Sequence, residues 1–177
     1  NGTRIWGTYY GGDTDDAVTT LVCDSLYNIY LGGTTTSASA NLATSGAIRT
    51  RPGTGMMAKL DSTGARVWGT YYADVITSMA LGPDNKVYFG GQTDSTTDIA
   101  TPGAYHASYT PPNFPPPPPL TKLPRMEDAF FGKLNNDGKR LWASYFGGPS
   151  NENSTTIAYG FGRLYVGGYT DSKEGVA

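Results

Sequence analysis

Apolar and polar positions alternate over short runs along most of the chain. Residues 17–23, 29–34, 56–60 and 66–72 are rich in β-branched and aromatic side chains, and turns with Gly, Asp or Asn separate them. This pattern is typical of β-strands, whose side chains alternate between two faces. No segment has the apolar spacing of three and four residues that an amphipathic helix requires. The pattern therefore predicts an all-β fold.

The same pattern returns as an internal repeat. All three tryptophans, Trp6, Trp68 and Trp142, occur in a recurring segment that reads IWGTYYGG, VWGTYY and LWASYFGG. A second segment reads IYLGGT, VYFGGQT and LYVGGYT, and its glycine pairs are Gly32 and Gly33, Gly90 and Gly91, Gly167 and Gly168. The first two tryptophans are 62 positions apart and the last two are 74 apart. The chain is thus built from units of about 60 residues, with an insertion in the second copy.

Four strands fit each unit, and this predicts the organisation of the chain. Residues 1–16 should supply a trailing strand at Arg4–Tyr10 and a turn of a preceding blade. Residues 17–75 and 76–148 should form two complete blades, and 149–177 the first half of a third. The second blade carries a Pro-rich insertion at 110–125 and should have these strands: 77–81, 86–93, 128–134 and 140–146.

Antiparallel four-stranded units at this period favour a β-propeller-like architecture, and a repetitive β-sandwich is the alternative. In a propeller, the glycine pairs would remove side chains where backbones crowd together. The three tryptophans would occupy equivalent, largely buried positions. A ring of typically four to eight blades would need roughly 240 to 500 residues, so we expect an incomplete ring. Its open edges near Arg4–Tyr10 and Leu164–Thr170 should pair with further propeller blades or neighbouring subunits.

Composition and charge exclude several classes of function. The formal net charge is −2 and only 16% of residues are charged, so the electrostatic signature of a nucleic-acid-binding protein is missing. The longest apolar runs fall far short of the roughly 20 residues that span a bilayer, so we expect no membrane insertion. Cys23 is the only cysteine, which excludes an intrachain disulfide. Its place in an apolar run predicts a buried small side chain.

Candidate catalytic residues are few. His106 is the only histidine and lies in a loop-like stretch without a nucleophile motif, so we expect neither Ser–His catalysis nor a Cys/His metal site. The densest acidic cluster, residues 13–16, has oxygen ligands suited to a cation. It lacks the spacing of a calcium-binding loop, and we interpret it as a turn. The sequence therefore predicts no catalytic, metal-binding or cofactor-binding residue.

The Pro-rich segment Pro111–Leu120 is distinct in composition. It should populate extended polyproline II, a conformation that docks into grooves of partner proteins. The candidate partner contacts are Phe114, Pro115, Pro117 and Leu120. A solvated or self-packed insertion is the alternative.

Four ordered motifs resemble the bacterial SBBP β-propeller repeat. They are TYYGG at 8–12, YFGGQT at 88–93, PGAY at 102–105 and DAFFGKLN at 128–135. The resemblance implies propeller blades of secreted or cell-surface bacterial proteins, often with adhesive or scaffolding roles and without a general catalytic residue set. Two positions depart from the repeat, since residues 73–74 are Ala-Asp in place of Gly-Gly and 55–57 are Gly-Met-Met in place of Asp-Ala-Phe.

We therefore predict a non-enzymatic, extracellular structural or adhesion repeat module of a larger secreted or cell-surface assembly. Its expected partners are further blades or neighbouring subunits, together with glycans or surface proteins. The alternative is a propeller enzyme. Residues 61–68 and 135–142 also resemble the tryptophan-docking repeats of quinoprotein propellers, a family that includes quinone-cofactor dehydrogenases. A polysaccharide-degrading enzyme is the other form of this alternative.

Overall fold

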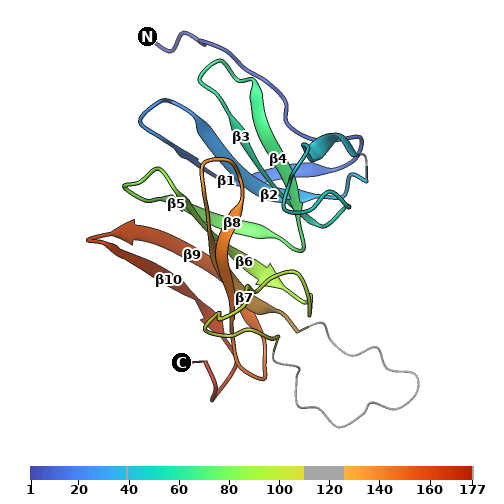
Figure 1. Cartoon of the computed structure of the whole chain (residues 1–177), viewed down its shortest axis with the longest axis vertical. Coiled ribbons are helices and arrows are strands. Elements are labelled where there is room, and N and C mark those ends of the chain that lie inside the picture. The colour runs from blue at the N-terminus through green and yellow to red at the C-terminus, as the bar shows by residue number, and fades with distance from the viewer. Residues whose placement is uncertain (39, 110–125, 177) are drawn as a thin grey trace.

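The computed structural model describes residues 1–38, 40–109 and 126–176, and within these ranges the protein is all-β. Ten strands form three antiparallel sheets, as Figure 1 shows, and the described residues form no closed barrel or ring. The first sheet contains β1 (Asp16–Cys23), β2 (Ile29–Thr35), β3 (Gly55–Leu60) and β4 (Arg66–Tyr72). The second contains β5 (Ile76–Leu81), β6 (Val87–Thr93), β7 (Asp128–Leu134) and β8 (Arg140–Phe146). The third contains β9 (Glu152–Gly160) and β10 (Arg163–Thr170), and a short 3-10 turn, η1, covers Ala40–Leu42.

The second sheet lies between the other two. Its first strand, β5, packs against β1 on one side and against β9 on the other. The N-terminal segment and the β9–β10 pair therefore lie at opposite ends of the molecule (Figure 1). The largest apolar cluster fills the space between the first two sheets, where Tyr72 packs edge-on against Phe89 and stacks on Phe130. A smaller cluster joins the second sheet to the third.

Two hairpins in the four-stranded sheets use the same turn. Asp61 after β3 and Asn135 after β7 each accept hydrogen bonds from the backbone amides two and four residues further on, over 2.8 to 3.0 Å. Gly64 and Gly138 then adopt φ angles of +87° and +75°, which side chains rarely tolerate. An Asx turn followed by a left-handed glycine thus explains why the segments DSTG and NNDG recur.

The glycine pairs mark close backbone contacts in the four-stranded sheets. β1 and β5 each contain a β-bulge opposite the pair on the next strand. A Cβ atom on Gly33 would lie 1.9 Å from the carbonyl oxygen of Ala17, and one on Gly91 would lie 1.8 Å from that of Val75. The prediction that these glycines sit where backbones crowd is confirmed at both positions.

The predicted strand at Arg4–Tyr10 is wrong, because residues 1–15 form no strand. The outer edge of β4 is already occupied by the loop that follows η1. Thr44 donates its amide to the Gly69 carbonyl over 2.9 Å, and Tyr71 donates to Arg49 over 3.2 Å. The N-terminal segment cannot add to that edge, and the described chain has no third strand of a preceding blade for it to pair with. It lies extended against the first sheet instead (Figure 1).

Cys23 is exposed, so the prediction of its burial is also wrong. It ends β1, an edge strand of the first sheet, and most side chains of that strand are exposed or only partly buried. The fold also bears on membrane insertion. In the described part of the chain, no helix is long and apolar enough to cross a membrane.

Candidate docking surfaces between the sheets

Each four-stranded sheet carries the same stack of three side chains, one from each of its last three strands. In the first sheet, Lys59 Nζ lies 5.0 Å from the centre of the Tyr30 ring and Trp68 lies 6.2 Å from it. The second sheet repeats the arrangement around Tyr88, with Lys133 at 4.8 Å and Trp142 at 6.3 Å. Lysine over an aromatic face is a favourable cation–π contact.

Burial of the tyrosine in this stack has an electrostatic consequence. Burial, together with the nearby carboxylate of Asp24, raises the pKa of Tyr30 to about 12. The Tyr30 hydroxyl stays protonated and donates to Asp24 over 3.3 Å. The stack is therefore a neutral aromatic platform covered by one lysine, and it offers no titratable group near neutral pH for acid–base chemistry.

Trp68 extends from this stack onto the following unit. Its Nε1–H group donates a hydrogen bond to the carbonyl oxygen of Asn136 over 2.9 Å. A Cβ atom on Gly138 would lie only 2.7 Å from the indole, so the turn after β7 accepts the ring because glycine leaves room for it. The turn that closes one hairpin is thus also the receptor for the tryptophan of the preceding unit.

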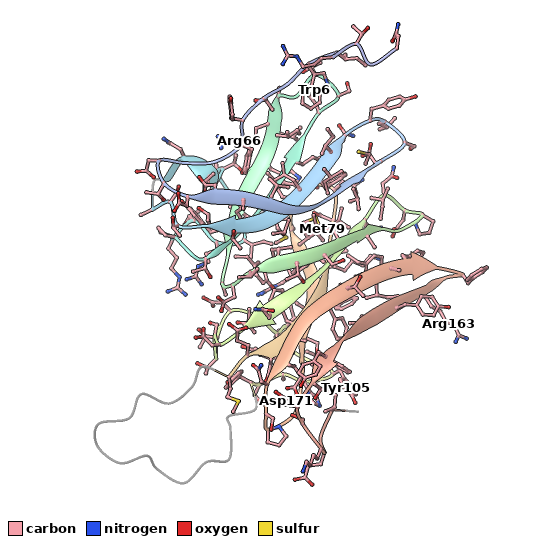
Figure 2. The ribbon with its side chains drawn as sticks, turned by 180° about the vertical axis from the view of Figure 1, so that it is seen from behind. Trp6, Arg66, Met79, Tyr105, Arg163 and Asp171 are labelled. Atoms are coloured by element: carbon pink, nitrogen blue, oxygen red, sulfur yellow. The ribbon has the colours of Figure 1, made fainter. Side chains whose placement is uncertain are left out.

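Trp6 makes the same contact without belonging to a strand. Its Nε1–H group donates to the Ser62 carbonyl over 3.0 Å, and a Cβ on Gly64 would lie 3.1 Å from its ring. Figure 2 shows Trp6 at the hairpin of the first sheet. Trp6 and Trp68 therefore occupy equivalent places against successive turns, although only Trp68 lies on the fourth strand of a sheet.

The tryptophans differ in burial. Trp68 is 7% exposed, whereas Trp6 and Trp142 are partly buried and so more exposed than Trp68. The reason is the number of neighbours. Trp68 lies between two four-stranded sheets, whereas Trp6 covers the first sheet from outside. In the described residues, the indole N–H of Trp142 finds no receptor turn.

Hydroxyl groups tie the first strand of each four-stranded sheet to the next sheet. Thr20 accepts a hydrogen bond from the Met79 amide, and Ser78 accepts one from the Ile157 amide, both over 3.0 Å. Thr156 has the equivalent place on β9 and is exposed. These bonds fix the register between neighbouring sheets, because they pair main-chain groups that the sheets' own ladders leave unused.

The loop after the second strand receives a tyrosine from the fourth. Tyr71 donates its hydroxyl proton to the Ser37 carbonyl over 2.9 Å, and Tyr145 donates to Ser95 over 2.8 Å. Ser172 after β10 forms the same turn, with its amide bonded to the preceding threonine hydroxyl over 2.9 Å. Among the described residues, no tyrosine hydroxyl donates a hydrogen bond to the Ser172 carbonyl.

The third sheet thus displays docking elements that are occupied in the other two. Tyr165 has the place of Tyr30 and Tyr88 but is 51% exposed, because neither a lysine nor a tryptophan covers it in the described chain. Gly167 shows the same contrast. A Cβ on its equivalent, Gly32, would meet Ile76 of the next sheet at 2.6 Å, whereas on Gly167 it would meet only Thr156 at 3.2 Å. Gly168 is exposed, whereas Gly90 and Gly91 are buried.

The acidic cluster at residues 13–16 has a structural role in the turn before β1. Asp16 accepts hydrogen bonds from the Gly12 amide over 2.7 Å and from the Ser37 hydroxyl over 3.1 Å. Glu152, at the start of β9, accepts equivalently from the Gly148 amide over 2.9 Å. No group of three or more potential metal ligands occurs among the residues that the structure describes.

His106 is held by the edge of β8. Its amide donates to the Ser144 hydroxyl over 2.9 Å, and its carbonyl accepts from the Tyr145 amide over 3.1 Å. The ring stacks on Tyr105 with 4.8 Å between centroids. His106 therefore shields the outer edge of the second sheet, as residues 44–49 shield that of the first.

The predicted partner contacts Phe114, Pro115, Pro117 and Leu120 lie outside the described residues, so this interpretation stays a prediction.

Sequence reasoning missed Lys59 and Lys133, although the recurrence of AKL and GKL in the third strand is a signal for them. It also missed Arg49 and Arg51, for which the repeat gives no signal.

Comparison with known proteins adds no relative. No protein-family model matches the chain, and no curated protein matches it. The resemblance to the SBBP repeat therefore rests on its motifs alone and stays a prediction.

Proposed function

We propose that this chain is a non-enzymatic structural or adhesion module, built from propeller-like blades, of a larger secreted or cell-surface assembly. The observation that carries the proposal is the docking of a tryptophan on the turn of the next unit. It occurs twice, at Trp6 and Trp68, while Trp142 presents the same indole without a receptor in the described chain. The contact is made at two of the three tryptophans, and the third could make it with a further unit. This pattern is typical of a repeat array that continues.

The required partner has a defined chemistry. It would extend the third sheet beyond β10 with a lysine-bearing strand, an Asx–glycine turn and a strand like β4 or β8. The lysine would cover Tyr165, as Lys59 covers Tyr30. The turn would place a carbonyl and a glycine against Trp142. Strand addition of this kind supplies main-chain hydrogen bonds and buries an exposed edge.

The location outside the cell is supported by the motif resemblance and by the low content of charged residues, 16%. A scaffolding role needs repetition and an extendable edge, both of which this chain has. It does not need an acid–base pair. The third sheet and its exposed tyrosines are therefore the surface through which we expect the module to act.

Analytical ultracentrifugation of the 177-residue chain over a wide concentration range tests the proposal. We expect a specific, concentration-dependent oligomer, because the open edge and exposed aromatic face of the third sheet can be covered by another copy of the chain. The Tyr165→Lys variant should weaken this association, since it places charge on the contact face. Tyr27→Lys is the control, because Tyr27 is also an exposed tyrosine, at 77% against 51% for Tyr165, but lies at the β1–β2 turn.

Two results would contradict the proposal. One is a folded chain that stays monomeric at every concentration. The other is enzymatic activity of the alternative class, in which an added quinone cofactor quenches tryptophan fluorescence and supports dehydrogenation.

A further inference from the structure

An arginine-lined pocket lies between the β2–β3 loop of the first sheet and the start of β8 in the second. Its volume is about 340 Å³, and its walls include Arg49, Arg51, Arg140, Asp98 and Tyr72. Small-molecule sites in proteins occupy roughly 300 to 1,000 Å³, so this pocket has the size for a single ring-sized ligand. It is separate from the third sheet and from the docking elements described above.

The pocket has an excess of positive charge. Arg49 Nη1 lies 3.2 Å from Asp98 Oδ2, and Arg51 pairs with the same carboxylate oxygen. Arg140 donates to the backbone carbonyl of Asp98 and to that of Ile99, the latter over 2.8 Å. Three guanidinium groups thus line the pocket with one carboxylate. Arg51 is 66% exposed along its side chain, and its other N–H groups are free to bind a ligand.

Two buried polar atoms at the pocket lack an acceptor for their proton. They are Nε of Arg49 and the hydroxyl of Tyr72, a residue that is 1% exposed and whose hydroxyl oxygen faces the Arg140 guanidinium. Burial raises the pKa of Tyr72 against a smaller, opposite effect of Arg140, so the hydroxyl keeps its proton as a donor. A buried donor without an acceptor is costly, and a bound anion would supply the acceptor.

The arginines of the β2–β3 loop are not part of the repeat. Arg49 and His106 occupy equivalent places, because each carbonyl accepts the amide of a fourth-strand tyrosine. Two residues further on, Arg51 corresponds to Ser108. Arg140 does have a counterpart, since Arg66 also donates to a backbone carbonyl of the loop after the second strand. The fold therefore requires Arg140 but neither Arg49 nor Arg51.

Asp98 is held in an unusual conformation at this place. Its φ angle is +67°, in the left-handed region that aspartate tolerates better than most residues other than glycine. Asp98 presents a single carboxylate to Arg49 and Arg51 and so occupies the place of an external anion.

We propose that this pocket binds the carboxylate of a small organic acid, of the size of one sugar acid, in exchange for Asp98. The planar fork of a guanidinium matches a carboxylate with two parallel hydrogen bonds, and the exposed Arg51 provides such a fork. Arg49 adds a further donor through Nη1, since its Nη2 already donates to the Pro52 carbonyl. The Tyr72 hydroxyl donates to the same ligand. Ile48 and Ala73 add an apolar wall, which suits the ring of an organic acid and contributes nothing to an inorganic ion.

Isothermal titration calorimetry of the full chain at low ionic strength tests this with galacturonate, galactose and inorganic phosphate as probes. We expect galacturonate to bind and galactose not to bind. The affinity for phosphate should be at least about tenfold lower than that for galacturonate. Arg51→Gln should weaken galacturonate binding about tenfold, because hydrogen bonds to charged groups are the strong ones. Arg163→Gln, on β10, is the matched control and should leave binding unchanged.

The Asp98→Asn variant gives a readout that a purely structural ion pair would not. It removes the competing carboxylate, so galacturonate should bind more tightly than to the unmodified chain. The proposal is overturned if phosphate binds as tightly as galacturonate, or if galactose does. It is also overturned if Arg163→Gln weakens binding as much as Arg51→Gln, or if folded Asp98→Asn binds less tightly. None of these outcomes depends on the oligomeric state, so this site and the proposed assembly can fail separately.

Discussion

Strands β6 and β10 carry nearly the same sequence and have different surroundings. They read VYFGGQT and LYVGGYT, and each is the second strand of its sheet. All but one residue of β6 are buried, whereas no residue of β10 is. β6 has β5 and β7 on its two edges and lies in the middle sheet, while β10 has β9 alone in the described chain. The motif determines that a strand forms, and the neighbouring strands determine how much of it is buried.

This difference separates two contributions to stability. In the middle sheet, an apolar side chain gains from strand neighbours on both edges and from the flanking sheet that its face meets, and each face meets one. In the third sheet, the same position gains from its own hairpin and from one flanking sheet. Substitutions at equivalent positions therefore measure what the missing neighbours contribute.

The largest difference is expected at Phe89 and Val166, which are equivalent. Phe89 is fully buried and packs against Tyr72 and Phe130, so Phe89→Ala should destabilise the fold by about 3 to 5 kcal/mol. Val166→Ala should cost about 1 kcal/mol, because Val166 is only half-buried. Urea unfolding followed by circular dichroism measures both. Equal costs would show that burial does not follow the neighbouring sheets.

A smaller contrast is expected at Gly32 and Gly167. An added Cβ on Gly32 meets Ile76 and Met79 of the next sheet, at 2.6 and 2.8 Å. Gly32→Ala should therefore cost about 1 to 3 kcal/mol through overpacking. Gly167→Ala should stay within about 0.5 kcal/mol, since only one methyl group within its own sheet must yield. Thermal unfolding of the two variants decides the point, and a greater loss at Gly167 would count against this packing.

The tryptophan contact gives the third comparison. Trp68→Phe removes the hydrogen bond to Asn136 and should cost about 1 to 2 kcal/mol. Trp142→Phe should cost less than about 0.5 kcal/mol in the dissociated chain, because no receptor turn is lost. Chemical unfolding at low protein concentration measures the difference. A comparable loss for Trp142→Phe would mean that its indole already has a partner.

The smallest effect concerns pH and the turn of the middle sheet. The hydrogen bond from Lys86, and the more distant charge of Lys133, lower the pKa of Asp84 to about 2. Because this pKa lies below the unfolded value of about 4, the stabilisation is present above pH 4 and is lost as the pH falls towards 2. Asp84 is well exposed, so the effect is below about 1 kcal/mol.

Comparing Asp84→Asn with the unmodified chain at pH 6 and pH 2 measures this. The variant should be slightly less stable at pH 6, and the difference should be much smaller at pH 2, where Asp84 is about half protonated. The turn between β9 and β10 holds Phe161 and Gly162 instead of a carboxylate, so it should contribute no such pH dependence. A variant that loses the same stability at both pH values would contradict the charge-based explanation.

Much of the fold could be predicted from the sequence, because the strands repeat and end at Asx–glycine turns. The expected strands of the first two units agree with β1 to β8 to within one or two residues. Burial was harder to predict, since Cys23 has apolar sequence neighbours but lies exposed at the end of an edge strand. Arg4–Tyr10 has the motif of a fourth strand, but a fourth strand pairs with the third strand of its own sheet, and the described chain has no such strand before β1.

The candidate sites also divide into features that the repeat predicts and features that depend on packing between sheets. The tryptophans and the glycine pairs of the docking surfaces were visible because they recur. The arginine pocket was not, because it combines a repeated residue, Arg140, with two unrepeated ones on a loop from another sheet. Residues brought together by packing across sheets leave no periodic signal in one sequence.

Hydrogen exchange of β10 at increasing protein concentration tests the central claim most directly, because strand addition must protect the amides on its outer edge. The account predicts that protection of β10 rises as the chain associates, while protection of β6 stays constant. If the chain associates and β10 exchanges as fast as in the monomer, or if β10 stays unprotected at every concentration, the third sheet is not a docking edge.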